Sequence, residues 1–186
     1  MKIAAFLARE HGLAGLHALL AKPGIQITAL YTHRYEPQSK LERAEIPLYL
    51  AIAKQHHIPF QTIDSSKEME TINLNADLIL SISWRYRFSQ KLLQSCPLGG
   101  VNIHRGALPQ YGGAEPIKRA LQNGEKHIFV CAHQMVEQID AGPILEYAIH
   151  DIVRIEGEEL EVAVERIKKE ITPLFVLLCS KVCEIY

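Results

Sequence analysis

The chain has 186 residues, 48% of them hydrophobic and 22% charged, and its 20 Lys+Arg against 21 Asp+Glu leave a formal net charge of -1. A chain of this length favours one domain that buries a substantial core, and this composition excludes an intrinsically disordered protein. The even charge balance argues against nucleic-acid binding by bulk electrostatic attraction, which needs a basic surplus.

In the first hundred residues, short apolar runs alternate with longer amphipathic segments. The apolar runs predict strands at residues 2–8, 25–31, 59–63, 77–83 and 100–103. The amphipathic segments predict helices at residues 13–20 and 41–57, the first after a turn at 10–12, and a further helix that begins at Ser65 or Ser66. Strands that alternate with helices form right-handed βαβ units. We therefore expect an α/β fold with a Rossmann-like, doubly wound and mostly parallel sheet.

The second half departs from this alternation and predicts a mixed C-terminal part of the sheet. Residues 104–115 (HRGALPQYGGAE) hold three glycines and a proline and are expected to form a loop. A short helix at 116–122 then precedes paired strands at 129–136 and 144–149, which flank a turn at 140–143. A final helix spans 158–183, with a kink or break at Pro173. No linker or repeat divides the chain, so residues 1–186 are interpreted as a single domain.

No segment of the sequence is typical of a membrane span or a metal site. No apolar stretch approaches the roughly 20 residues that cross a bilayer. The cysteines form no CxxC pair and stand at Cys96, Cys131, Cys179 and Cys183. We therefore expect a cytoplasmic protein whose thiols stay reduced. The oligomeric state stays open, with a homodimer among the alternatives.

Chemically useful side chains gather where the strand at 100–103 ends. Asn102 and His104 are two residues apart, so on a strand their side chains share one face. Ligands of open α/β sheets bind beyond the carboxyl ends of the strands, where Asp140 of the later turn can complete the set. An Asn amide and a protonated His donate to an oxyanion, and a nearby carboxylate holds the imidazole charged or accepts a proton.

None of these three residues is a usual nucleophile. The set therefore favours direct attack on an acyl group by a substrate amine or by water. The alternative is a structural role, in which Asn102 caps the following loop and His104 is simply exposed at a strand end.

Three linked motifs resemble the folate-dependent formyltransferase family, and most closely the catalytic domain of the methionyl-tRNA formyltransferases. The first is the segment 102–113, which reads N-I-H-x-x-x-L-P-x-Y-x-G. The second runs over residues 113–120 (GAEPIKRA) and is followed by Gly124-Glu125. The third comprises residues 134–136 (QMV) and 139–145 (IDAGPIL), and it contains Asp140.

The resemblance implies that an acceptor amine attacks the formyl carbon of 10-formyltetrahydrofolate. By position, Asn102 and His104 stabilise the tetrahedral oxyanion, and Asp140 tunes His104 and passes the amine proton away. The pterin of the donor is expected between the segment 83–88 and the loop near Asp140. The implied donor-binding residues are Trp84, Arg85, Tyr86, Arg87, Phe88 and Ile139. Two of them, Arg85 and Arg87, are also candidates for the glutamyl tail of the folate or for an acceptor phosphate.

The acceptor is expected to be the amine of a small molecule, and no metal is implied. Transfer RNA is disfavoured as the acceptor, because no additional C-terminal barrel domain and no basic surplus are present in the sequence. Two alternatives stay open: a hydrolase that releases formate from 10-formyltetrahydrofolate, and a non-catalytic folate-binding domain.

Several positions differ from the family pattern. Arg105-Gly106 stands where Pro-Ser commonly follows the histidine, and the segment 84–88 is aromatic and basic instead of small and aliphatic. Residues 8–12 (AREHG) replace the glycine-rich phosphate loop that glycinamide ribonucleotide formyltransferases carry after their first strand. His133 matches a histidine of some family members and is interpreted as a packing residue on a strand.

Overall fold

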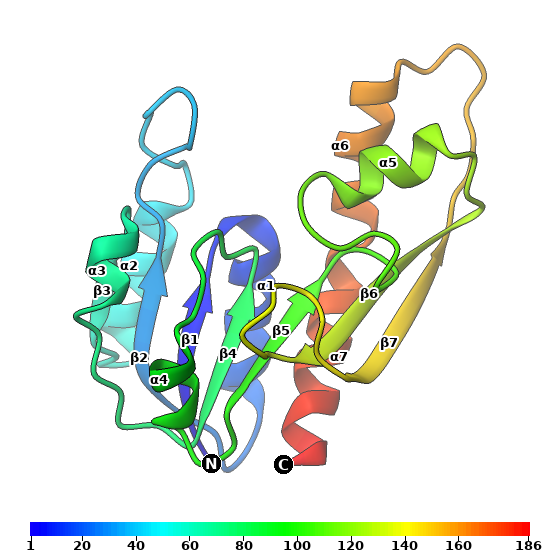
Figure 1. Cartoon of the computed structure of the whole chain (residues 1–186). Coiled ribbons are helices and arrows are strands. Elements are labelled where there is room, and N and C mark those ends of the chain that lie inside the picture. Colours follow the sequence, from blue (N-terminus) through cyan, green and yellow to red (C-terminus); the bar gives the residue numbers. More distant parts are fainter.

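Seven strands form one sheet in the order β3-β2-β1-β4-β5-β6-β7 in the computed structural model, which describes residues 1–186 (Figure 1). The strands are β1 (Lys2–Leu7), β2 (Gln26–Thr32), β3 (Phe60–Thr62), β4 (Leu78–Ile82), β5 (Gly100–His104), β6 (His127–Gln134) and β7 (Ile144–Asp151). Strands β1 to β5 pair in parallel, whereas β6 pairs antiparallel with both β5 and β7. The expected α/β fold, with a mostly parallel sheet and a mixed C-terminal part, is confirmed.

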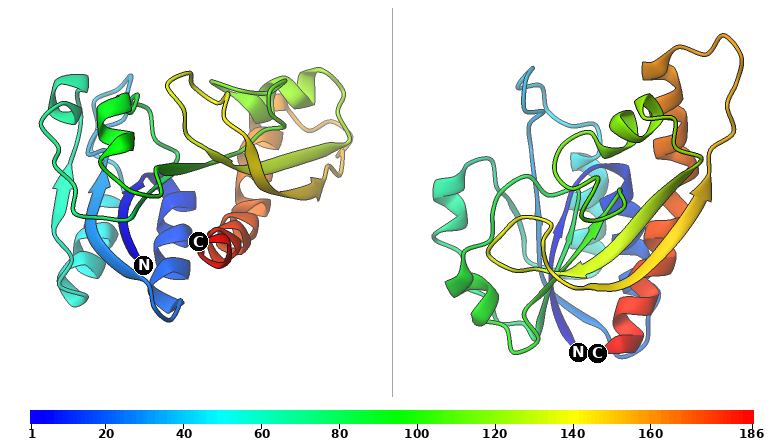
Figure 2. Two further views of the ribbon diagram at one scale, coloured as in Figure 1. Left: turned by 60° about the horizontal axis from the view of Figure 1, so that its bottom comes forward. Right: turned by 45° about the vertical axis from the view of Figure 1, so that its right-hand side comes forward.

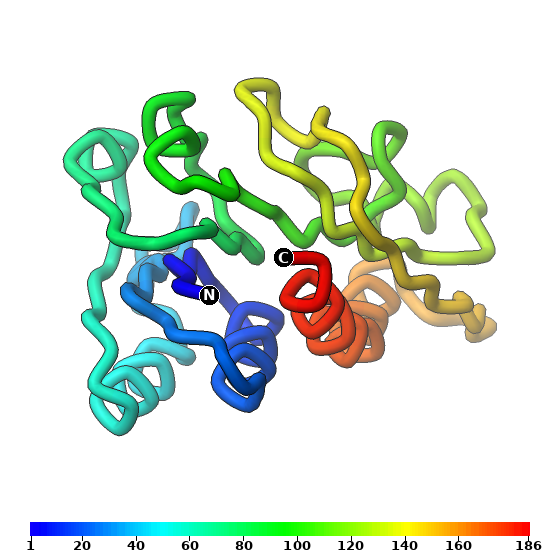
Figure 3. Tube along the Cα trace, turned by 90° about the horizontal axis from the view of Figure 1, so that it is seen from below, coloured from blue at the N-terminus to red at the C-terminus, as the bar shows by residue number.

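Seven helices surround this sheet. They are α1 (Arg9–Ala21), α2 (Ile46–Gln55), α3 (Ser66–Met69), α4 (Gln90–Gln94), α5 (Pro116–Gln122), α6 (Leu160–Glu170) and α7 (Thr172–Ile185). Seen from below, α2, α1 and α7 lie in a row on one side of the sheet, and α3, α4 and the loop 135–143 lie on the other (Figure 3). Helices α5 and α6 lie beside each other next to the antiparallel strands (Figure 2). None of the helices has the length and apolarity of a bilayer-spanning segment.

Each face of the sheet has its own apolar core. The larger core contains 31 buried residues, among them Phe175 of α7 and Ile103 of β5. The smaller core contains 11 buried residues, among them Phe6 of β1, and lies on the side of α3 and α4. Because Ile103 faces the larger core, Asn102 and His104 on either side of it point to the opposite face.

The carboxyl ends of the five parallel strands meet at one edge of the sheet, at the top of Figure 1. The chain order reverses between β1 and β4, which are neighbours in the sheet. Strand β4 is buried along its whole length, as its continuous apolar run predicts. At this edge β1 leads into α1, β4 into the segment 83–88, and β5 into the loop 105–115. These connections therefore surround the crevice where an open α/β sheet binds its ligands.

The start of the first helix differs from the sequence prediction. α1 begins at Arg9, so the turn expected at residues 10–12 was wrong. Gly12 lies inside the helix and against β1: a Cβ there would lie 3.0 Å from the carbonyl carbon of Leu7 and 2.5 Å from the hydroxyl oxygen of Tyr49. The missing side chain lets the helix start directly after the strand.

The second helix was also predicted too early, at residue 41. Residues 35–45 form a loop instead, closed by a β-bridge between Tyr35 and Glu42. Glu36 of this loop forms ion pairs with both Arg9 and Arg43. These contacts hold the segment in an irregular conformation, and α2 begins only at Ile46.

The C-terminal helix is broken as expected. Residues 158–183 divide into α6 and α7, with Pro173 in the first turn of α7, where its missing N–H costs no helical hydrogen bond. Strand β6 begins at His127 and ends at Gln134, earlier at both ends than predicted. Helix α4 was not predicted, because five residues are too few to show a helical period.

Candidate active site

Polar side chains surround Asp140 at the carboxyl edge of the sheet. Asn102 and His104 extend from β5, His133 extends from β6, and Asp140 lies in the loop between β6 and β7. The structure thus brings together the three residues that the sequence analysis selected as catalytic. Their chemical roles stay a prediction.

The Asp140 carboxylate is surrounded by hydrogen-bond donors. Its Oδ2 accepts from the N–H of Gly113 at 2.8 Å and lies 3.5 Å from His104 Nδ1. Its Oδ1 lies 3.3 Å from His133 Nε2 and 3.5 Å from Asn102 Nδ2. Burial by itself raises the pKa of Asp140, but the contacts with His133, His104 and the Gly113 amide outweigh it and lower the pKa to about 2. Asp140 is therefore ionised at neutral pH.

The backbone around Asp140 has a specific shape. Asp140 has a φ of 53°, in the left-handed region that few residues other than glycine adopt. Nearby, Gly142 lies so close to β6 that a Cβ would stand 1.8 Å from the carbonyl oxygen of Gln134. Only glycine fits there, and this close approach fixes the turn that presents Asp140.

Both ring nitrogens of His104 face hydrogen-bond acceptors. Nε2 lies 2.8 Å from the carbonyl oxygen of Tyr111, to which it donates, and Nδ1 faces Asp140. Burial lowers the pKa of His104, against the opposing effects of the Asp140 charge and the Tyr111 carbonyl. Nε2 carries one proton and donates it in the hydrogen bond to the Tyr111 carbonyl. The second proton of the imidazolium therefore lies on Nδ1, toward Asp140.

The loop 105–115 holds both of these groups. It supplies the Tyr111 carbonyl to His104 and a backbone N–H to Asp140. The Tyr111 hydroxyl donates to Glu125 Oε1 at 2.6 Å, and Arg119 of α5 donates to two carbonyls of the loop. Helix α5 and the turn after it therefore anchor the loop that positions the site.

Two cavities meet at this centre. The first, which we call the Phe88 cavity, has a volume of about 110 Å³ and lies between the segment 84–88, Asn102, His133 and the loop 135–140. The second, which we call the Arg105 cavity, has a volume of about 400 Å³ and is lined by His104, Arg105 and the start of α1. Four residues line both cavities: Trp84, Arg85, Ile139 and Asp140.

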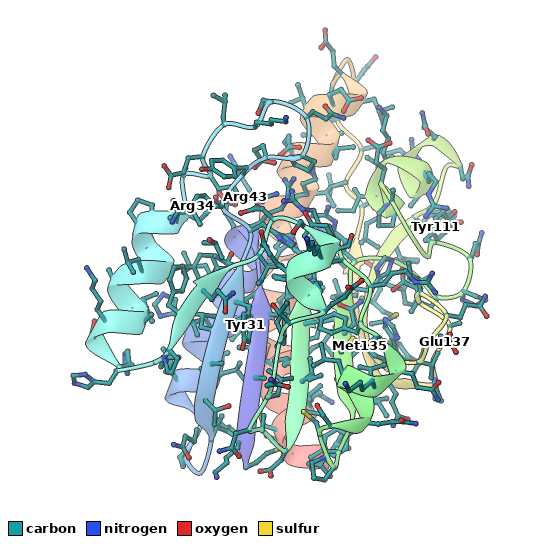
Figure 4. All side chains as sticks on the ribbon, turned by 60° about the vertical axis from the view of Figure 1, so that its left-hand side comes forward. Tyr31, Arg34, Arg43, Tyr111, Met135 and Glu137 are labelled. Atoms are coloured by element: carbon teal, nitrogen blue, oxygen red, sulfur yellow. The ribbon has the colours of Figure 1, made fainter.

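All six predicted donor-binding residues line the Phe88 cavity. Trp84 stacks on His33 with ring centroids 3.9 Å apart, and its buried indole N–H has no hydrogen-bond partner. Arg85 pairs with Asp64 at 2.9 Å, and Arg87 donates to the carbonyl of Glu137 at 3.1 Å. Figure 4 shows Glu137 and Met135, both of which line this cavity. The cavity therefore has aromatic walls and two arginines that are already paired with protein acceptors.

Sequence reasoning underestimated His133. Its side chain is buried, as the packing interpretation requires, but it also contacts Asp140 and lies 3.1 Å from Asn102 Nδ2. In the antiparallel register His133 stands directly opposite Asn102. Sequence reasoning needed the register of the β5–β6 pair to place His133 in the site, because this register sets His133 beside Asn102.

Comparison with known proteins identifies the family. Residues 1–176 match the formyl transferase family. The chain belongs to this family. The methionyl-tRNA formyltransferases of Thermotoga sp. (strain RQ2) and Thermotoga maritima are each 33% identical to it over 129 residues, which cover 67% of this chain and 41% of theirs. The chain thus spans less than half the length of these relatives.

Solved structures share the fold. A formyltetrahydrofolate deformylase from Pseudomonas syringae pv. tomato superposes with a TM-score of 0.74 at 18% identity, covering 97% of this chain and 59% of that one. A phosphoribosylglycinamide formyltransferase from Bacillus halodurans superposes with a TM-score of 0.71 at 21% identity, covering 98% and 95%. The expected resemblance to the folate-dependent formyltransferases is confirmed. The expectation that tRNA is not the acceptor is not confirmed, because the two curated relatives are tRNA formyltransferases by name.

Proposed function

We propose that the chain transfers a formyl group from 10-formyltetrahydrofolate to the amine of a small-molecule acceptor at the centre around Asp140. One observation carries the proposal. Asp140 lines both cavities, with Asn102 on the side of the Phe88 cavity and His104 on the side of the Arg105 cavity. A reaction between two bound molecules requires adjoining cavities that share the reacting groups. The donor then occupies the Phe88 cavity and the acceptor the Arg105 cavity.

The Phe88 cavity fits the pterin and formyl-bearing part of the donor. Trp84, Tyr86 and Phe88 offer aromatic surface to a flat ring system. The unpartnered indole N–H of Trp84 is a further donor beside this space.

The acceptor amine attacks the formyl carbon from the Arg105 cavity. A C–N bond forms, and the formyl oxygen becomes an oxyanion that accepts from the Asn102 amide and from Nδ1–H of protonated His104. The contact of 3.5 Å between Asn102 Nδ2 and Asp140 is long for an N–H···O bond, so this N–H is available to the oxyanion.

The proton leaves the attacking amine toward Asp140, directly or through a water molecule. As the bond between the formyl carbon and N10 breaks, this proton passes from Asp140 to N10 of the tetrahydrofolate, directly or through water, so the transfer is balanced. Before the reaction, a pKa of about 2 keeps Asp140 ionised, and its charge favours the charged form of His104 against the effect of burial.

The size of the Arg105 cavity supports an amine acceptor over water. A hydrolase needs room for one water molecule, whereas a cavity of about 400 Å³ lies within the range of about 300–1,000 Å³ that is usual for small-molecule sites. This volume supports transfer to a small amine over simple release of formate.

The direct test is product analysis with the purified chain and 10-formyltetrahydrofolate. Phosphoethanolamine, ethanolamine, glycine and initiator methionyl-tRNA are supplied in turn, and formate and formylated amine are measured by mass spectrometry. We expect formylated small amine and little formate without an acceptor. His104→Ala is expected to slow transfer at least about a hundredfold, whereas His127→Ala, at a surface histidine paired with Asp151, is the matched control.

Each alternative has its own outcome in this assay. Formate release at an equal rate with and without amines favours the hydrolase. Folinic acid binding by calorimetry, with neither product formed, favours a non-catalytic folate-binding domain. Efficient formylation of the tRNA contradicts the small-molecule acceptor, and near-normal turnover of His104→Ala contradicts the proposed centre.

A further inference from the structure

We infer that the acceptor carries a phosphate group, which Arg105, Arg9 and Arg43 bind in the Arg105 cavity. The inference rests on the proposed function and names the chemical class of its second substrate.

The Arg105 cavity has a surplus of positive charge. Its lining holds four arginines, at positions 9, 43, 85 and 105, against two carboxylates, those of Glu115 and Asp140. Asp140 is already engaged by the two histidines, and Glu115 is exposed to solvent. Neither carboxylate therefore neutralises the arginines.

Carboxylates behind the lining neutralise only part of this charge. Asp64 pairs with Arg85 at 2.9 Å. Arg9 and Arg43 share a single oxygen, Glu36 Oε2, at 3.1 and 3.3 Å. One carboxylate thus serves two guanidinium groups.

Two of the guanidinium groups have unused donors. Nη1 of Arg43 is buried without a hydrogen-bond partner, on a side chain that is only 3% exposed. Arg105 is half-buried and has no hydrogen bond or ion pair, and burial and then the nearby charge of Arg9 lower its pKa. Glu165, whose charge acts in the opposite direction, pairs with Lys168 instead. Buried donors without acceptors cost free energy, and a bound anion removes that cost.

A phosphate fits these donors better than a carboxylate does. A phosphate group presents three strong acceptor oxygens and carries up to two negative charges, whereas a carboxylate presents two oxygens and one charge. Guanidinium groups bind such oxygens through paired N–H donors. Three guanidinium groups from three separate segments therefore match the phosphate.

The arrangement also orients the acceptor toward the reacting centre. Arg105 directly follows His104, Arg9 begins α1, and Arg43 lies beyond the carboxyl ends of the parallel strands (Figure 4). Phe175 contributes an apolar wall and stacks on His11, which adds no charge because burial lowers its pKa to about 4. A phosphate held by the arginines leaves the amine at the end of the cavity that contains Asp140.

Binding of inorganic phosphate to the full chain tests the site without any chemistry. Titration calorimetry on the wild type is compared with Arg105→Gln, for which we expect at least about tenfold weaker binding. Arg105→Lys keeps the charge but loses the planar fork of donors, so its affinity is expected to lie between the two. Arg34→Gln removes an exposed arginine beside Arg43 that does not line the cavity, and it is expected to bind phosphate like the wild type.

Competition identifies the source of the phosphate. Phosphoethanolamine is expected to displace inorganic phosphate, whereas ethanolamine and glycine at equal concentration are not. Displacement by a short oligoribonucleotide but not by phosphoethanolamine would overturn the small phosphorylated amine. Folinic acid is expected to bind the wild type and Arg105→Gln equally, and a selective loss of folinic acid binding would assign the arginines to the donor instead.

The outcomes separate this inference from the proposed function. Absence of phosphate binding to the wild type, or equal binding by Arg105→Gln, overturns the site even if formyl transfer occurs. Phosphate binding that is lost in Arg105→Gln supports the site even if no amine is formylated, and in that case only the proposed function fails.

Discussion

Replacing Asp140 by asparagine removes the central negative charge while keeping the size of the side chain. The carboxylate lies 3.5 Å from His104 Nδ1 and raises the pKa of His104 against the effect of burial. An opposite charge at this range favours the charged form of a histidine. In Asp140→Asn we therefore expect the pKa of His104 to fall further below its ordinary value, because nothing then replaces the opposing charge of Asp140.

The free energy of unfolding and the rate of formyl transfer are also expected to fall in Asp140→Asn. Since folding lowers the pKa of Asp140 from 3.8 to about 2, its ionised form stabilises the fold by on the order of 2 kcal/mol above pH 4, and this contribution is lost as the pH falls toward 2. The asparagine variant lacks this contribution. It also loses the proton acceptor and the charge that favours protonated His104, so transfer is expected to slow about 10²–10⁴-fold.

Three measurements check this prediction: an NMR titration of the His104 ring, urea unfolding, and single-turnover formyl transfer. Asp151→Asn is the matched control, because Asp151 also contacts a histidine, His127 at 2.8 Å, but on the exposed surface. An unaltered His104 pKa together with a transfer rate within tenfold of the wild type would refute the reasoning that Asp140 acts through His104.

Further predictions concern the turn, the buried histidines and a buried thiol. Gly142→Ala places a methyl group against the carbonyl oxygen of Gln134, so we expect a loss of about 1–3 kcal/mol in urea unfolding and slower formyl transfer. Burial lowers the pKa of His11 to about 4 and that of His33 to about 3, whereas the unfolded chain takes up these protons near pH 6.5. The free energy of unfolding is therefore expected to decrease as the pH falls from about 6.5 to 3, as measured by urea unfolding at each pH. Burial also raises the pKa of the Cys179 thiol, which should stay unmodified by iodoacetamide at pH 8 until the chain unfolds, as read by mass spectrometry.

These predictions have simple controls. At Gly157 no atom lies within 4 Å of an added Cβ, so Gly157→Ala introduces only the strain of a φ of 75° and should leave formyl transfer unchanged. A free energy of unfolding that is constant between pH 6.5 and 4 would contradict the buried neutral histidines. Rapid alkylation of Cys179 in the folded protein would contradict its burial.

The sheet was predictable because buried parallel strands are continuous apolar runs. Strand β4 shows this directly, since all of its residues are buried. The start of α1 was not predictable, because Gly12 locally disfavours a helix. Only the fit of Gly12 against Leu7 and Tyr49 in the folded chain decides for a helix.

The residues of the site were also predictable only in part. Asn102 and His104 share a face through the period of a strand, and a motif locates Asp140, so sequence sufficed to bring them together. Arg9 and Arg43 lie far from Arg105 in the chain, and their convergence depends on how α1 and the loop 35–45 meet the end of β5. No local pattern carries that information.

Trp84 has a practical consequence for every experiment above. It is the only tryptophan of the chain, and it lines both cavities. Excitation of the indole therefore gives an emission signal from the junction of the two cavities alone, without any attached dye. Folinic acid entering the Phe88 cavity is expected to change this fluorescence strongly, and phosphate in the Arg105 cavity to change it less. None of the substitutions described alters Trp84, so the same optical reporter serves the wild type and every variant.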